Sequence, residues 1–263
     1  MPKIELYIAR NLVMEISLRQ IALVAAQLAP LEAALVEIFD VLPCHRDPAV
    51  VAYGLENVLL PFGEQFLEIV APTRTATAAG RFLERRGGDG GYMVITQCDN
   101  HDVRRAHLAR LGIRIAHEFK APGFRNMQLH PRDTGGSFLE IDQQLGNGRD
   151  WLPAGPAWRE QVRTTRVRGF AAAEIQAGNP HTLAAHWASI LQVPVGSAAG
   201  VPNIALNEAM LRFVPCRDGR PEGLAGLDVL TLDRTAILAA AAARGLVIED
   251  WGFSVGGMRW CLL

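Results

Sequence analysis

Apolar and polar residues alternate in a short segment, Phe-Leu-Glu-Ile, that occurs twice, at residues 66–69 and 138–141. Alternation in a strand places each glutamate on the same side as the phenylalanine two positions earlier, with aliphatic residues on the other side. The strand pattern at residues 20–24 recurs at residues 92–96, at the same spacing as the repeated segment, and a helical pattern follows each of these two strands. Matches in the same order of strand, helix and strand predict an internal repeat.

The pattern divides the chain into four units with the same order of elements. In the first we expect a strand at 15–26, a helix at 30–41, and strands near 50–53, 57–61 and 66–70. The helix is predicted because apolar residues recur there every three to four positions. After a short helix at 78–86 and a glycine-rich turn at 87–91, the second unit has a strand from 92, a helix at 102–111, and strands near 114–119, 126–130 and 137–142.

The second half of the chain repeats this scheme. Its expected strands are 168–176, 203–206, 210–215, 227–232, 247–250, 252–255 and 258–262, and its expected helices are 180–192 and 234–244. Residues 146–164, rich in Gly and Pro, interrupt the pattern and are read as a linker. Two domains follow, 1–145 (units 15–72 and 91–144) and 165–263. In the linker, Trp151 and Trp158 either anchor it in a core or cover a pocket. Residues 1–14 match no repeat and suit an extra strand or an arm onto a partner.

Composition excludes several classes of function. The 263 residues carry a formal net charge of -1, so the chain lacks the excess of positive charge that is typical of nucleic-acid-binding proteins. None of the four cysteines lies in a C-x-x-C pair and no signal peptide is recognised, so we expect reduced thiols and a cytoplasmic protein. The longest apolar run, residues 21–42, is interrupted by charged residues, so we expect no membrane span.

Two segments, 54–68 and 129–140, resemble the vicinal oxygen chelate superfamily. It includes glyoxalase I, methylmalonyl-CoA epimerase, extradiol dioxygenases and bleomycin-resistance proteins. The resemblance implies an α+β fold of two tandem glyoxalase-like domains, each made of two βαβββ units that form a half-open barrel. It also implies a small-molecule substrate or ligand, and it leaves a homodimer open.

In that superfamily four residues hold a metal, usually His, Glu, His and Glu. The matching positions are Gln20, Glu68, Tyr92 and Glu140. Two carboxylates and an amide oxygen favour Mg, Mn or Ca over Zn, with Fe left open. Tyr92 is either the fourth ligand or a hydrogen-bond donor to substrate. Because both histidines are absent, a metal-free pocket and structural pairing of the glutamates with arginine stay open as alternatives.

Proton transfer is expected from Glu140 or His130, although His130 is also placed to cap the turn before Pro131. Further substrate contacts are expected from Tyr92, Gln128, Phe66 and Phe138. The function implied is a lyase- or isomerase-type enzyme acting on a small oxygen-bearing metabolite that a divalent cation chelates. A dioxygenase is less favoured without the histidines. The alternative is a metal-free protein of the same fold that binds a small molecule.

The C-terminal domain lacks the ligand pattern, because Arg212 and Cys261 occupy the positions that match Glu68 and Glu140. We therefore expect it to share the fold without a metal and to play a structural or pocket-closing role.

Overall fold

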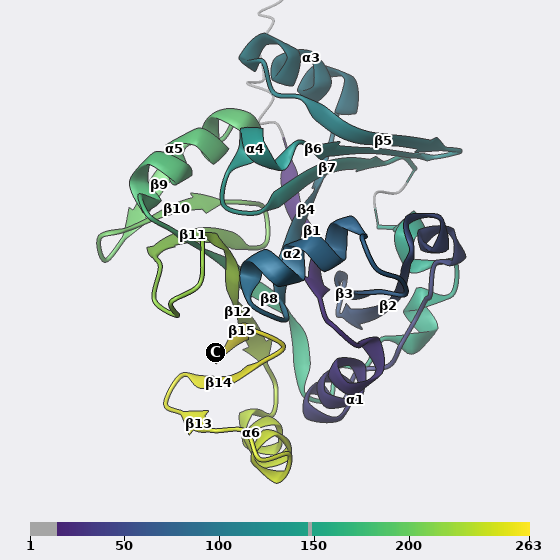
Figure 1. The fold of residues 1–263 in the computed structure, drawn as a ribbon, viewed down its shortest axis with the longest axis vertical. Coiled ribbons are helices and arrows are strands. Elements are labelled where there is room, and N and C mark those ends of the chain that lie inside the picture. The colour runs from purple at the N-terminus through teal and green to yellow at the C-terminus, as the bar shows by residue number, and fades with distance from the viewer. Residues whose placement is uncertain (1–14, 147–148) are drawn as a thin grey trace, which may run out of the picture.

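The computed structural model describes residues 15–146 and 149–263, so the expectation for residues 1–14 lies outside the described residues. The chain forms two mixed β-sheets that pack against each other, with helices around them (Figure 1). The predicted α+β fold of two tandem βαβββ-type domains is confirmed. The boundaries proposed between the domains stay a prediction.

The first sheet carries the repeated segment. Its strands are β1 (Ile16–Val24), β2 (Leu55–Phe62), β3 (Gln65–Pro72), β4 (Gly90–Cys98), β5 (Ile115–Ala121), β6 (Phe124–Leu129) and β7 (Phe138–Gln144). They lie in the order β2-β3-β1-β4-β7-β6-β5. In the centre β1 and β4 are antiparallel, and each has a parallel neighbour, β3 beside β1 and β7 beside β4. The two copies of the Phe-Leu-Glu-Ile segment therefore lie in equivalent strands on either side of the central pair.

The second sheet repeats this arrangement. Its strands are β8 (Val167–Ala177), β9 (Val195–Ala198), β10 (Val201–Ala205), β11 (Met210–Pro215), β12 (Gly223–Thr231), β13 (Ile248–Glu249), β14 (Gly252–Val255) and β15 (Met258–Leu262). They lie in the order β13-β14-β15-β12-β8-β11-β10-β9. Again the central pair, β8 and β12, is antiparallel and is flanked by parallel strands.

The helices are α1 (Leu28–Phe39), α2 (Ala78–Arg86), α3 (His101–Leu111), α4 (Pro131–Thr134), α5 (Pro180–Leu191) and α6 (Arg234–Ala243), and the 3-10 helices are η1 (Pro48–Tyr53), η2 (Leu152–Ala154) and η3 (Trp158–Gln161). Side-chain oxygens of Thr77, Asn100, Asn179 and Asp233 accept a backbone N–H in the first turn of α2, α3, α5 and α6. These caps satisfy N–H groups that have no partner inside the helix, so they define where each helix begins.

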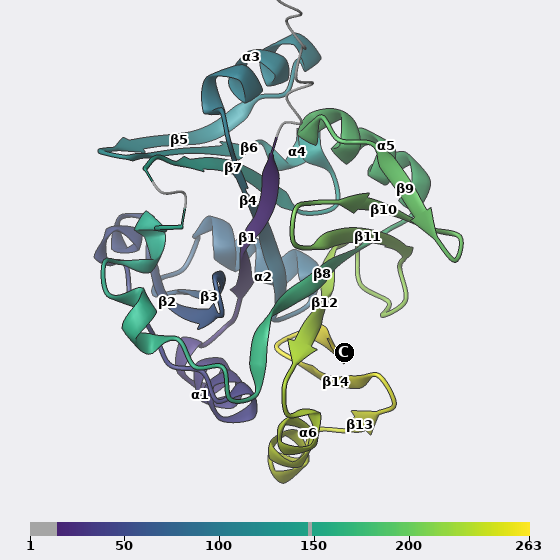
Figure 2. The same ribbon diagram turned by 180° about the vertical axis from the view of Figure 1, so that it is seen from behind.

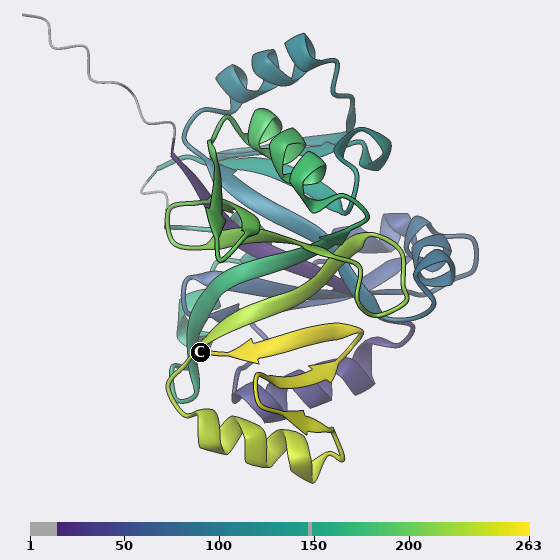
Figure 3. The ribbon, with the colours of Figure 1, turned by 90° about the vertical axis from the view of Figure 1, so that its left-hand side faces the viewer.

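One continuous hydrophobic core spans both sheets. The helix α1 of the first half lies beside α6 of the second, and α3 lies beside α5 at the opposite end of the molecule (Figures 1 and 3). At the α1 end the ring of Phe39 contacts Phe253 and Trp260, with centroids 5.9 and 5.0 Å apart. Within the described part of the chain, no helix has both the length and the hydropathy needed to cross a membrane.

One local prediction was wrong. The strand expected at 50–53 is the 3-10 helix η1, because Asp47 caps it, Pro48 opens it and the left-handed Gly54 ends it. Its β-branched residues point outward instead of pairing, and Val51 is 66% exposed. Only an isolated bridge between His45 and Leu59 replaces the missing strand. In the third unit the strand β9 was not expected; it is short and exposed along its length.

Candidate functional site

Both glutamates of the repeated segment line one cavity of about 150 Å³ on the first sheet, named here the inner cavity. Glu68 lies opposite Ala22 and Glu140 lies opposite Ile95, so the two glutamates occupy equivalent places in the repeat. Gln20 lines the same cavity. The full lining is Gln20, Asp47, Asn57, Leu59, Glu68, Met93, Ile95, Glu140, Asp142, Trp151 and Pro153.

A wider, mostly apolar space of about 530 Å³, named here the outer cleft, adjoins the inner cavity. The two spaces share Asp47, Glu140 and Pro153. The outer cleft is lined by His45, Asp47, Ala49, Val50, Tyr53, His117, Phe119, Phe124, Asn126, Glu140, Leu152, Pro153, Gly155 and Pro156. Together they form a site with a polar inner end and an aromatic outer part, a combination typical of small-molecule pockets.

Glu68 lies at the centre of a chain of hydrogen bonds. Gln20 Nε2 donates to Glu68 Oε2 at 2.9 Å, and Asn57 Nδ2 donates to Glu68 Oε1 at 2.7 Å. Trp151 Nε1 donates to Gln20 Oε1 at 2.7 Å, and the backbone N–H of Asp47 donates to Asn57 Oδ1 at 2.8 Å. Burial raises the pKa of Glu68, and these two amide donors oppose that rise.

The orientation of both amides follows from chemistry. An indole N–H and a backbone N–H can only donate, so the oxygens of Gln20 and Asn57 must face Trp151 and Asp47. Each amide then presents its NH₂ group to Glu68. The carboxylate of Glu68 therefore accepts one hydrogen bond on each oxygen from a donor of fixed direction.

Glu140 and Asp142 form an acidic pair in the inner cavity. They lie two positions apart on β7 and hence on one face of the sheet, and Asp142 is fully buried. Burial, with the nearby Glu68 charge, raises the pKa of Glu140 to about 7, and burial together with the Glu140 charge raises the pKa of Asp142. Asn126 Nδ2 donates to Asp142 Oδ1 at 3.2 Å. Two adjoining buried carboxyls cannot both ionise readily, so the pair holds a proton.

The residues of the inner cavity, as they lie, do not fit the predicted metal centre. A cation there would need the oxygen of Gln20, which faces Trp151 and accepts its indole N–H, while the NH₂ group of Gln20 lies toward Glu68. In residues 15–146 and 149–263, no group of three or more His, Cys, Asp or Glu side chains is arranged to hold a metal. The divalent cation implied by the resemblance, whether Mg, Mn, Ca or Fe, stays a prediction.

The alignment of Tyr92 with Gln20 was wrong. In the pairing of β1 with β4, Ala22 lies opposite Met93 and Leu23 lies opposite Gly91, so Tyr92 is the extra residue of a β-bulge. The residue equivalent to Gln20 is Met93, which lines the inner cavity. Tyr92 packs instead among apolar residues, and burial raises the pKa of its phenol.

Three further predicted contact residues lie outside both spaces. Phe66 is buried against Trp158, with ring centroids 5.0 Å apart. Phe138 packs against Tyr92, with centroids 4.9 Å apart. Gln128 pairs with Glu140 across β6 and β7 but lines neither space. The phenylalanines share the glutamate face of their strands, yet aromatic neighbours cover them.

His130 caps α4, as the alternative prediction had it. Its Nδ1 accepts the backbone N–H of Arg132 at 3.2 Å, and Arg114 Nη2 lies 3.4 Å from the same nitrogen. His130 lines neither the inner cavity nor the outer cleft, so a role for it in proton transfer at this site has no geometric support. Arg19 and Arg125, the arginines that the structural-pairing alternative would use, have other partners: Arg125 pairs with Asp102, and Arg19 Nη2 donates to the backbone oxygen of Arg149.

The linker forms part of the site wall. Trp151 and Trp158 are buried in a small cluster with Phe66 and Phe124, which confirms that they anchor in a core, and Trp151 also lines the inner cavity. Figure 2 shows the linker running beside β2 and β3. No residue after the linker lines either space, so the pocket-closing role expected of the C-terminal domain was wrong for these two spaces.

Sequence reasoning missed several lining residues. Asp142 and Asn57 could have been found, because alternation places Asp142 on the face of Glu140, and places Asn57 on the face of Leu59, which lies opposite Glu68. Trp151 reaches Gln20 across a long stretch of chain, and no local pattern signals such a contact.

Comparisons with known proteins agree with this architecture. No protein-family model matches the chain, and no curated protein matches its sequence significantly. Among solved structures, a mutant of 4-hydroxymandelate synthase from Streptomyces coelicolor superposes with a TM-score of 0.69 at 15% identity, covering 89% of this chain and 76% of that one. A hypothetical protein from Staphylococcus aureus gives a TM-score of 0.68 at 8% identity, covering 95% and 99%. Methylmalonyl-CoA epimerase from Mycobacterium tuberculosis matches 49% of this chain and 88% of its own at 20% identity, with a TM-score of 0.43.

The first two likenesses extend over both sheets, and identities this low establish the fold alone. The chain thus shares its two-sheet fold with these two proteins, as the repeated segments indicated. A shared fold does not carry over an activity, so the function has to be argued from the site.

Proposed function

We propose that the N-terminal half of the chain binds a small organic molecule directly, through its own carboxyl and amide groups, without a bridging metal ion. The observation that carries this proposal is the pair of oriented amides at Glu68. A site prepared for a cation turns ligand oxygens toward it, whereas here Gln20 presents its NH₂ group to Glu68 and its oxygen to Trp151. Here both oxygens of Glu68 accept hydrogen bonds whose direction Trp151 and the Asp47 backbone determine.

The lining also indicates what kind of molecule fits. The inner cavity contains the carboxyl groups of Asp47, Glu68, Glu140 and Asp142 and no cationic side chain. It therefore favours a cationic or hydrogen-bond-donating head group over an anion. The outer cleft offers aromatic and aliphatic walls for an apolar body. A compact amine or alcohol attached to an aromatic or aliphatic body has this shape and chemistry.

An enzyme of the lyase or isomerase type is the second candidate. The position of Glu140 favours it, because Glu140 lines both the inner cavity and the outer cleft and lies near Asp142. At this junction the head group of a ligand would meet the apolar body of the same ligand. A carboxyl there can move a proton on the bound molecule. The metal-dependent form of this activity, predicted from the resemblance, requires Gln20 to turn away from Trp151. The cytoplasmic location and a homodimer likewise remain proposals.

A binding and melting experiment tests the proposal. We expect benzylamine to raise the melting temperature of the wild type, and neither Mg²⁺ nor Mn²⁺ nor EDTA to change it, because binding only to the folded state stabilises it by mass action. The variant Tyr53→Ala, which removes an exposed ring from the outer cleft, should bind benzylamine more weakly at an unchanged intrinsic melting temperature.

The opposite pattern would support the metal-dependent enzyme. If Mn²⁺ or Mg²⁺ stabilises the wild type but not the Glu68→Gln, Glu140→Gln double variant, the two carboxylates hold a cation and the direct-binding proposal fails. The double variant is the appropriate control because it keeps the shape of both side chains while removing their charge; at position 68 the amide keeps one of the two acceptor oxygens that Gln20 and Asn57 use.

A further inference from the structure

The second sheet has a pocket of its own, of about 270 Å³, named here the arginine pocket. It lies on β8, β11, β12 and β15, the strands equivalent to those that carry the inner cavity. It is lined by Glu174, Arg212, Arg217, Gly226, Leu227, Asp228, Trp251, Arg259 and Cys261.

Strand register explains how the pocket is built. Arg212, Glu174, Gly226 and Arg259 lie directly opposite one another in a row across four neighbouring strands. Residues paired in this way point to the same face of a sheet. In the middle of the row Gly226 has no side chain, and an added Cβ would lie 3.3 Å from the backbone oxygen of Arg259. Because Gly226 has no side chain, the space above it between Arg212 and Arg259 stays unfilled.

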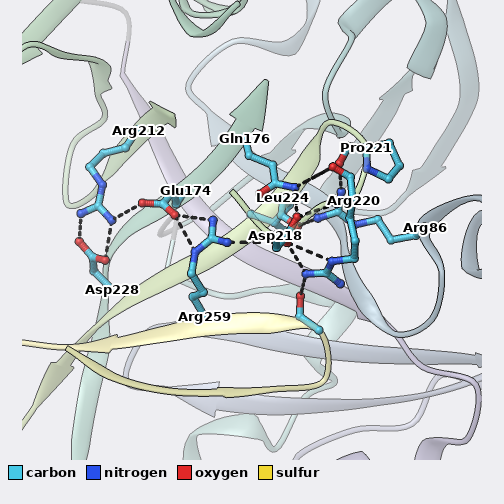
Figure 4. Close-up of polar contacts among 11 residues, drawn as sticks. Arg86, Glu174, Gln176, Arg212, Asp218, Arg220, Pro221, Leu224, Asp228 and Arg259 are labelled. Atoms are coloured by element: carbon cyan, nitrogen blue, oxygen red, sulfur yellow. Dashed lines mark hydrogen bonds and ion pairs between the residues drawn. The ribbon is translucent and has the colours of Figure 1, made fainter. Parts of the chain in front are cut away.

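Glu174 holds both arginines in place (Figure 4). Its Oε2 accepts from Arg212 Nη2 at 3.1 Å, while its Oε1 accepts from Arg259 Nε at 3.0 Å and from Nη2 at 2.6 Å. The two side chains stay 28% and 22% exposed. The arginines are therefore oriented by a carboxylate beneath them yet remain accessible from the pocket.

The cationic charge of the pocket exceeds the anionic charge. Asp228 accepts two hydrogen bonds from Arg212. Asp218, the other carboxylate near Arg259, is bound by Arg220 and Gln176 and lies 3.7 Å from Arg259 Nη1. Lining the pocket are three arginines and two carboxylates, and the third arginine, Arg217, is exposed without a hydrogen bond or ion pair to any described residue.

We propose that the arginine pocket binds a small organic anion. Its carboxylate or phosphate group would meet the guanidinium groups of Arg259 and Arg217, which present N–H donors suited to oxyanions. The body of the ligand would pack on Trp251, an indole that is 37% exposed although it lines the pocket. A metal ion does not suit this site, because both carboxylates of the lining are already paired with arginine.

This inference does not depend on the function proposed for the first sheet. The two sites share no residue, and their charge favours opposite ligands. Variants of one site therefore serve as controls for the other.

The test is a calorimetric titration of the full chain with benzoate and with phenyl phosphate, and with methyl benzoate as the uncharged analogue. Methyl benzoate has no hydrogen-bond donor for the acidic inner cavity, so it does not report on the first site. We expect both anions to bind and methyl benzoate not to bind at the same concentrations. Comparing the two anions identifies which oxyanion the pocket prefers. Affinity should fall with added salt, since the attraction is between charges near solvent.

Variants test whether the anion binds in the arginine pocket. Arg217→Gln should raise the dissociation constant for the preferred anion by about two- to fivefold, as expected for an exposed ion pair. Arg110→Gln is the matched control, an exposed arginine on α3 that does not line the pocket, and it should have no effect. Trp251→Ala should also weaken binding, whereas Glu140→Gln in the inner cavity should not.

Three results would overturn the proposal. The first is equal binding of methyl benzoate and the anions, and the second is no binding of either anion at millimolar concentration. The third is anion binding that Arg217→Gln and Trp251→Ala leave unchanged while both variants keep the wild-type melting temperature. In that case the arginines serve only to pair the buried carboxylates of the second sheet.

Discussion

Glu68 illustrates how neighbours decide what a carboxylate can do. In isolation a buried glutamate between aliphatic residues suggests a metal ligand, because an unpaired buried charge is costly. The side chains of Gln20 and Asn57 offset part of that cost by donating one hydrogen bond to each oxygen, and burial still raises the pKa of Glu68. Their direction is fixed from outside, by Trp151 and the backbone of Asp47. A fixed polar network of this kind is suited to orienting a ligand.

Glu140 should make stability depend on pH. Burial raises its pKa from an ordinary 4.5 to about 7, so the folded state binds a proton more tightly than the unfolded state. The stabilising contribution is therefore complete at low pH, falls as pH rises from about 4.5 to about 7, and is lost above that. Its size is at most about 3 kcal/mol for one carboxyl.

Urea denaturation of the wild type and of Glu140→Gln at pH 5.5 and pH 8 measures this effect. We expect the free energy of unfolding of the wild type to fall between the two pH values, and that of the variant to fall clearly less, because glutamine does not ionise. Equal pH dependence in the two proteins would mean that Glu140 does not titrate in this range.

Trp151 should stabilise the folded state through the hydrogen bond of its indole N–H as well as through the packing of its ring. Trp151→Phe leaves Gln20 Oε1 without its donor inside the fold, which costs about 1–3 kcal/mol beyond the loss of packing. The matched control is Trp158→Phe, since Trp158 belongs to the same cluster and its N–H makes no hydrogen bond to the described residues. Chemical denaturation should show the larger loss for Trp151→Phe; similar losses would assign both tryptophans to packing alone.

Elements with strong local signals were predictable from the sequence. The helix α2 runs over the predicted residues 78–86, and α1, α3, α5 and α6 lie at the other predicted helix positions, whereas α4 was not predicted. The strand expected at 50–53 failed because Val and Tyr have high β-propensity, but Asp47, Pro48 and Gly54 impose a 3-10 turn on them. At these residues the turn-forming residues outweighed β-propensity.

The candidate site was predictable only in part, for related reasons. The repeated strand identified Glu68 and Glu140, because alternation along one strand fixes which residues share a face. Tyr92 was misplaced because Gln20 and its equivalent Met93 are 73 residues apart, whereas the two glutamates are 72 apart. A difference of one residue exchanges the faces of a strand. The bulge at Tyr92 has its counterpart at Arg19 in β1, so both repeats contain it and it leaves no difference between them that an alignment could detect.

Across the whole molecule, two sheets of the same plan carry opposite chemistry. The inner cavity of the first collects carboxyl groups around two amides. At equivalent strands the second has Arg212 and Arg259, balanced by Glu174 and Asp228. The repeat thus preserves the hydrogen-bonding frame, while the residues on one face of each sheet determine which ligand the face favours.

The shared core implies that the two sheets unfold together. Strands β4 and β12 contact each other at the centre of the molecule, where Gly91 lies against Leu224. A Cβ added at Gly91 would lie 2.5 Å from the backbone oxygen of Leu224, so Gly91→Ala requires the two strands to separate slightly. We expect a loss of about 1–3 kcal/mol in the free energy of unfolding, the usual cost of overpacking a core.

Calorimetry of wild type, Gly91→Ala and Gly80→Ala tests this expectation. Gly80 lies in the exposed helix α2, where an added methyl group meets only the hydroxyl of Thr77 at 3.2 Å, so its replacement should be neutral or slightly stabilising. The wild type should melt in a single transition, because the core cluster runs through both sheets. Gly91→Ala should melt at a lower temperature, still in one transition. Two separate transitions in the wild type would show instead that each sheet is stable alone and that the contact between β4 and β12 merely joins them.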